Sequence, residues 1–108
     1  MTVKELLHRH GFTALSLPDP DREVSGCYIG DLLSWVMGRA GSDNVWLTIM
    51  TNINTVAVAS LTDVALVLLT ENVQPEPEIL AAAKAKGVNV ASTEKPTFEA
   101  AVLLRDDV

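Results

Sequence analysis

Cysteine, aromatic residues and long apolar runs are all scarce in this sequence. Cys27 is the single cysteine among 108 residues, and aromatic residues make up only 5% of the chain. A lone cysteine excludes an intrachain disulfide, which is typical of proteins from reducing compartments. No apolar run reaches the length of a bilayer span, and the N-terminus lacks the basic region and apolar core of a signal peptide. These absences predict a cytoplasmic location.

Positive charge is also in short supply. The chain carries 8 Lys and Arg residues against 14 Asp and Glu residues, a formal net charge of −6. An acidic surface repels phosphate groups, so neither nucleic acid nor an anionic membrane is an expected partner. Apolar residues are abundant, at 48% of the chain. Length and composition together predict one compact domain that spans residues 1–108.

The phosphate-binding and nucleophile motifs of many α/β enzymes are missing. The sequence contains no G-x-x-x-x-G-K-[ST], no G-x-G-x-x-G and no G-x-S-x-G, which excludes the sites that these motifs build. Cys27 has no basic neighbour in the sequence to activate its thiol, so a structural role is favoured over a nucleophilic one. His8 and His10, even with Cys27, would make an incomplete metal site. We therefore expect no enzymatic activity, no metal and no cofactor.

Two further groups of residues have a functional and a structural interpretation. Asp19, Asp21 and Glu23 stand in a proline-rich segment and could hold a cation, but a solvated loop is favoured. Trp35 and Trp46 could stack on a ligand, but core or interface packing is favoured for both.

The order of apolar segments predicts a three-layer α/β domain with a mostly parallel sheet of four to five strands. Thr55–Leu61 is ambiguous, since its alternation suits a strand and its alanines suit a helix. A helix is favoured because parallel strands on either side of it need a crossover. The expected strands are Thr13–Leu17, Glu23–Tyr28, Val45–Ile49, Ala65–Leu69 and Val88–Ala91. The expected helices run from Thr2 to Gly11, from Asp31 to Gly41, over Ile53–Thr62, from Pro75 to Gly87 and from Pro96 onward.

Apolar spacing also predicts which helix faces are buried. In the first helix this face holds Val3, Leu6, Leu7 and His10. In the second it holds Leu32, Leu33, Trp35, Val36, Met37 and Ala40, and in the last Phe98, Ala101, Val102 and Arg105.

Polar clusters follow the two most apolar strands. Thr51, Asn52 and Asn54 follow the first, and Thr70, Glu71 and Asn72 follow the second. Ligands of parallel α/β sheets usually bind at the carboxyl ends of strands, so these six residues form a candidate ligand-binding site. The structural alternative is that Asn52 caps a helix and that residues 70–72 form a turn.

At these same residues the chain resembles the DRTGG domain family. The resemblance runs from about Ala14 to Leu104. It is carried by the Gly-Asp-Leu-Leu at Gly30–Leu33, the strand Val45–Ile49, the apolar strand that ends at Thr70, Pro75-x-Pro, and the Thr-Phe-Glu-Ala-Ala from Thr97. It implies an α/β domain similar to the N-terminal domain of HPr kinase, a type of domain that also occurs in phosphotransacetylases and beside CBS domains. It implies a regulatory role and no HPr kinase activity, which belongs to a separate P-loop domain.

The sequence departs from the family at the residues that name it. The resemblance places the family's Asp-Arg pair at Thr51 and Asn52 and its Gly-Gly pair at Glu71 and Asn72, whereas Thr70 is retained. Asparagine cannot replace the charge of an arginine that clamps a phosphate, and Glu71 adds bulk and negative charge. A phosphate site of the family is therefore expected to be lost or changed.

Three hypotheses follow. The first is a non-catalytic regulatory domain that binds a protein partner or a small-molecule effector at the strand ends, as a homodimer. The second is a nucleotide or phospho-metabolite sensor. The third, an enzyme, lacks any arrangement of nucleophile and base that the spacing supports.

Overall fold

The computed structural model describes residues 1–108 and consists of five helices and five strands. The helices are α1 (Val3–His10), α2 (Leu33–Arg39), α3 (Ile53–Thr62), α4 (Pro77–Ala85) and α5 (Thr97–Leu104). The strands are β1 (Thr13–Ser16), β2 (Cys27–Ile29), β3 (Val45–Thr48), β4 (Leu66–Leu69) and β5 (Val90–Ser92). None of the helices combines the length and apolar character needed to cross a bilayer.

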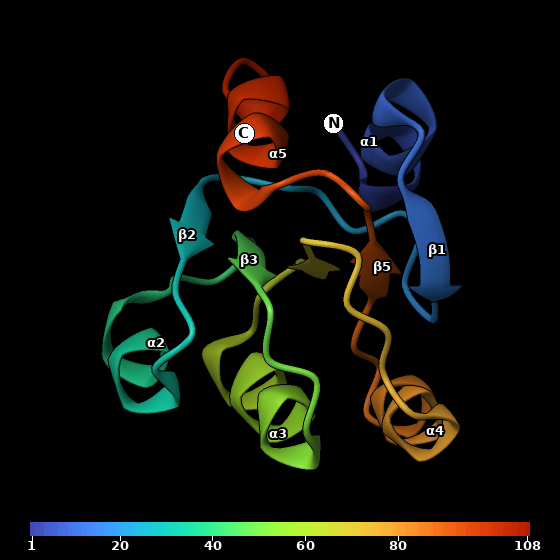
Figure 1. Ribbon diagram of the computed structural model, residues 1–108, viewed down its shortest axis with the longest axis vertical. Coiled ribbons are helices and arrows are strands. Elements are labelled where there is room, and N and C mark those ends of the chain that lie inside the picture. Colours follow the sequence, from blue (N-terminus) through green and yellow to red (C-terminus); the bar gives the residue numbers. More distant parts are fainter.

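All five strands belong to one sheet in the order β1-β5-β4-β3-β2. Strands β2 to β5 are parallel, and β1 joins the β5 edge in the antiparallel direction. Helices α2, α3 and α4 cover one face of the sheet, and α1 and α5 cover the other (Figure 1). The predicted three-layer α/β architecture with a mostly parallel sheet is confirmed.

Two apolar clusters fill the spaces between the layers. Val45 and Leu47 of β3 point into the cluster beneath α1 and α5, and Trp46 points into the cluster against α2, α3 and α4. All three side chains are fully buried. This alternation places a continuous apolar strand between two helical layers, as expected of a parallel sheet covered on both faces.

Local signals in the sequence account for the ends of α1 and α3. Thr2 and Glu5 form a complete capping box at α1, and Gly11 ends that helix in the left-handed conformation. The Asn52 side chain accepts a hydrogen bond from the Thr55 backbone N–H, so Asn52 caps α3 as predicted. The ambiguous segment Thr55–Leu61 is helical, because it is the crossover between β3 and β4.

Several predicted boundaries are wrong. Helix α2 begins at Leu33 rather than Asp31, because the Asp31 carboxylate instead accepts hydrogen bonds from the Thr48 hydroxyl at 2.8 Å and the Ile49 N–H at 3.0 Å. The second strand is Cys27–Ile29 rather than Glu23–Tyr28, because Glu23 pairs with the N-terminus in an isolated bridge to Thr2. Helix α4 begins at Pro77 and the last strand, Val90–Ser92, begins at Val90, each start being two residues later than predicted.

The predicted buried faces of α2 and α5 are only partly right: Leu33, Val36 and Ala40 of the first and Ala101 of the second contact the core clusters. Val36 is the one fully buried residue of α2. Leu32, which precedes the helix, is 60% exposed, and Trp35 within it is 53% exposed. In α5 the buried residues are Ala100 and Leu104, and Phe98 is 78% exposed. Helix α2 lies at the end of its layer beside the edge strand β2 (Figure 1), so only one side of it meets other elements. The buried face of α1, by contrast, is confirmed for Val3, Leu6 and Leu7.

Candidate functional site

The carboxyl ends of β4 and β5 form the place in the sheet where the chain changes sides. After β4 the chain passes to α4 on one face, and after β5 it passes to α5 on the opposite face (Figure 1). Neighbouring loops that diverge in this way open a crevice at the strand ends, which is the usual ligand site of an open α/β sheet. The loop Thr70–Asn72 therefore stands where a ligand site is expected.

Internal hydrogen bonds join the two loops at this point. The Glu71 N–H donates to the Lys95 carbonyl at 2.9 Å, and the Asn72 N–H donates to the Thr93 carbonyl at 3.1 Å. The hydroxyls of Thr70 and Thr97 are 2.6 Å apart. The polar groups of these two loops therefore bind each other. In many open α/β sheets the corresponding groups bind a ligand instead.

The carboxylate of Glu71 lies at the N-terminus of α5. One of its oxygens accepts a hydrogen bond from the Thr97 backbone N–H at 2.8 Å and lies 3.3 Å from the Thr97 hydroxyl. Free N–H groups and the helix dipole make this end of a helix attractive to anions. The carboxylate of Glu71 thus occupies the position at which the start of α5 could otherwise bind a phosphate.

Glu71 and Asn72 have a backbone conformation that glycine adopts freely. Their φ angles are +61° and +60°, in the left-handed region that disfavours most side chains. These are the positions at which the family resemblance places the Gly-Gly pair. The turn therefore has a glycine-like conformation although neither residue is glycine.

Replacing Glu71 with alanine is expected to lower the free energy of unfolding by about 1 kcal/mol, since it removes the acceptor at the start of α5. Glu71→Gly should cost less, because it also relieves roughly 1 kcal/mol of left-handed backbone strain. Urea denaturation of both variants measures the difference, and Asn54→Ala is a control at an exposed residue on α3. Equal midpoints for Glu71→Ala and wild type would mean that this carboxylate does not stabilise α5.

The cluster after β3 is also partly engaged. Asn52 is the α3 cap, and Asn54 is exposed. Thr51 borders a hollow of about 10 Å³ between α3 and α4, lined mainly by apolar side chains such as Val56, Leu69 and Ile79. That volume holds at most about one water molecule. The structure places the two predicted clusters at the ends of neighbouring strands, with no cavity of ligand size between them.

A larger groove, which the sequence did not reveal, lies on the other side of Asn72. Its volume is about 530 Å³ and its lining is almost entirely polar. The lining residues are His10, Gly11, Thr13, Leu15, Asn72, Gln74, Ser92, Thr93, Glu94 and Lys95. They come from three separate parts of the chain, so no local motif could have identified the groove. Of the six predicted site residues only Asn72 lines it.

The Cys27 thiol, the candidate nucleophile in the sequence, is not activated. Burial raises the pKa of the Cys27 thiol to about 11, even though part of the residue reaches the surface. The thiol is therefore protonated at neutral pH and is a poor nucleophile. No three His, Cys, Asp or Glu side chains lie close enough together to hold a metal ion.

Comparisons with known proteins agree on one type of domain. The model of the DRTGG domain family matches residues 42–106, which is 65 of the 108 residues. A solved structure of the CBS and DRTGG domains of the regulatory region of a Clostridium perfringens pyrophosphatase, complexed with its activator diadenosine tetraphosphate, superposes with a TM-score of 0.77. The match covers 99% of this chain and 47% of that one at 15% sequence identity, so it establishes the fold. No curated protein matches the sequence, and neither comparison identifies a catalytic domain.

Proposed function

Because this chain belongs to the DRTGG domain family, we propose that it is a non-catalytic regulatory domain that acts through protein contacts, as a homodimer. The main support is the contrast between its strand ends and its surface. At the strand ends Asn52, Thr70 and Glu71 already bind other groups of the chain. On the surface, ten large apolar side chains are exposed.

Exposed apolar surface is the feature that a binding domain needs. The exposed side chains are Ile29, Leu32, Trp35, Met37, Ile49, Ile53, Leu61, Phe98, Val102 and Leu103. The guanidinium of Arg39 lies 3.8 Å from the centre of the Trp35 ring. Tryptophan and arginine are the residue types most often found at the energetic centres of protein interfaces. These features support a domain that buries apolar surface against another protein.

The pyrophosphatase relative supports the regulatory part of the proposal. In that enzyme the matching domain stands beside CBS domains in a region that is complexed with an activator. This chain spans about half the length of the compared region. The presence of the same fold in a regulatory region supports a regulatory role for this chain.

A second candidate function is a sensor of nucleotides or phospho-metabolites. The polar groove of about 530 Å³ supports it, because Lys95 lines the groove and makes no ion pair within the chain. The site would then lie at the β5 side of the strand ends and would include Asn72. Thr51, Asn52, Asn54, Thr70 and Glu71 would serve only to hold the loops.

A thermal-shift panel of adenine nucleotides and acyl phosphates separates the two functions. For a domain that acts through protein contacts we expect no change in melting temperature with any member. A ligand at a hundred times its Kd would raise the free energy of unfolding by about 2.7 kcal/mol. In a domain of this size that corresponds to a rise of roughly 10 °C or more. A saturable rise that Lys95→Ala abolishes would overturn the protein-contact proposal in favour of the sensor.

A further inference from the structure

The two helices on one face of the sheet, α1 and α5, are too few to cover all five strands. Five strands at about 4.8 Å spacing span roughly 24 Å, whereas a packed helix is only about 10 Å wide. Three helices, α2, α3 and α4, cover one face, but only α1 and α5 lie on the other (Figure 1). There α1 lies over the β1–β5 end and α5 lies over β3 (Figure 1). The edge strand β2 is left without a helix above it.

The register of the sheet shows which β2 side chains point to this uncovered place. Cys27 and Ile29 pair with Val45 and Leu47 of β3, so all four side chains lie on the face of α1 and α5. Val45 and Leu47 are fully buried there, whereas Cys27 is exposed and Ile29 is 51% exposed. The difference arises because the helical layer ends above β3.

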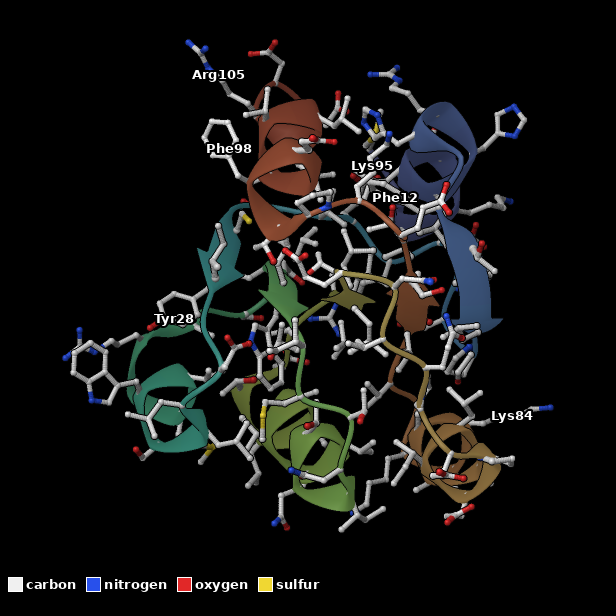
Figure 2. All side chains as sticks on the ribbon, viewed as in Figure 1. Phe12, Tyr28, Lys84, Lys95, Phe98 and Arg105 are labelled. Carbon is white, nitrogen blue, oxygen red and sulfur yellow. The ribbon has the colours of Figure 1, made fainter.

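Helix α5 presents apolar side chains beside the same place. Phe98 is 78% exposed, Val102 53% and Leu103 38%. With Lys95 and Glu99 they line a shallow hollow of about 290 Å³ on the exposed side of α5, which contains no residue of β2. Figure 2 shows Phe98 projecting from α5 on the side away from α1 and above β2, and Val102 is one turn further along the helix. We call the surface formed by Cys27, Ile29, Phe98 and Val102 the β2–α5 face.

We propose that a second copy of this chain covers the β2–α5 face, with its α5 lying beside α5 of the first copy as the missing third helix of this layer. The inference rests on the homodimer of the proposed function and assigns its contact surface. A two-fold arrangement buries the same face on both copies, since each α5 then covers β2 of its partner.

Charge favours this face for self-association. The chain has a net charge of −6, so two copies repel each other over most of their surface. No charged residue occurs between Val24 and Gly30. Arg105, one turn after Val102, lies on the same side of α5 as Phe98 (Figure 2), so the charge that borders the face there is positive. Lys95 and Glu99, which border the hollow on α5, carry opposite charges.

The apolar area is sufficient for a weak dimer. From typical side-chain areas and the exposed fractions above, the face presents roughly 300 Å² of apolar surface per copy. With an apolar share of about 60%, the total buried area would be roughly 1,000 Å², in the range of weak, transient interfaces. The dimer is therefore expected to dissociate in the micromolar range, as a reversible regulatory contact would.

Sedimentation equilibrium of the full chain tests the face. Over about 1 µM to 1 mM, a range that brackets weak specific interfaces, the wild-type mass should rise from 11.6 kDa to twice that value. Phe98→Glu should raise the dissociation constant at least tenfold, because two like charges then meet in an apolar contact. The matched control is Leu61→Glu, at a 72% exposed apolar residue on α3, and it should leave the constant unchanged.

A second variant tests the strand side of the face. Ile29→Lys should weaken the dimer in the same way, and circular dichroism should show that both variants keep the wild-type fold. A wild-type chain that stays monomeric throughout the range would overturn the homodimer itself. A wild-type dimer that neither Phe98→Glu nor Ile29→Lys weakens would overturn the assignment of this face and leave the proposed function intact.

Discussion

Replacing Trp46 with alanine is expected to lower the free energy of unfolding by about 3–5 kcal/mol, the usual cost of deleting a large buried aromatic side chain. Trp46 lies in the middle of β3, is fully buried and packs in the cluster under α2, α3 and α4. Its indole N–H also donates to the Gly30 carbonyl at 2.9 Å, which holds the turn before α2. Chemical denaturation followed by far-ultraviolet circular dichroism measures the loss without relying on tryptophan fluorescence.

The other tryptophan is the matched control. Trp35 is 53% exposed and its main contact is the Arg39 guanidinium, so Trp35→Ala should cost no more than about 1 kcal/mol. Trp46→Phe should fall between the two, because it keeps most of the apolar contact and loses the hydrogen bond to Gly30. Equal losses at positions 35 and 46 would contradict this distinction between a core tryptophan and a surface tryptophan.

The second large effect is expected at Asn89, which is only 2% exposed. Its side-chain amide accepts from the Asp19 N–H at 3.0 Å and donates to the carbonyls of Asp19 at 2.8 Å and Ala65 at 3.0 Å. Asn89→Ala removes the partner of the Asp19 N–H and of the Ala65 carbonyl, whereas the Asp19 carbonyl still accepts from the Arg22 N–H at 3.3 Å. Each buried unsatisfied group costs about 1–3 kcal/mol. A total loss of about 3 kcal/mol is expected in the same denaturation experiment.

Two further measurements make the Asn89 result specific. Hydrogen exchange should show faster exchange at the Asp19 amide in Asn89→Ala, because that N–H loses its acceptor. An exposed asparagine, as in Asn72→Ala, should leave that amide unchanged. A destabilised Asn89→Ala variant with wild-type protection at Asp19 would show that the amide network does not hold this loop.

Predictions from the sequence succeeded where the signal is local or where the topology left one choice. The capping box at Thr2 and the cap at Asn52 depend on residues three apart, and both are present. The helix at Ile53–Thr62 followed from the need to connect two parallel strands, although its own residues also suit a strand.

The acidic loop after Pro18 shows the limit of such reasoning. Its residues favoured a solvated loop over a cation site, and nothing in them indicated that Asn89, 70 positions from Asp19, binds its backbone.

The candidate site was predicted only in part, because the use of a side chain depends on what lies opposite. Glu71 and Thr70 stood out in the sequence as surplus polar groups, but their partner Thr97 is more than twenty residues away. The polar groove is assembled from three segments and has no local signature. Ligand binding by Thr51, Asn52, Asn54, Thr70, Glu71 and Asn72 stays a prediction.

The sequence by itself determined the class of the fold, its alternation of strands and helices, and the family to which the chain belongs. Only the tertiary structure decided which apolar residues are covered. Trp35 and Trp46 are alike in the sequence, and so are Phe98 and Leu104 as apolar residues of one helix, yet one of each pair is buried and the other exposed. The physical reason is that burial depends on the neighbouring layer: α1 and α5 do not reach across β2, and the uncovered apolar surface beside it is where we expect the second copy to bind.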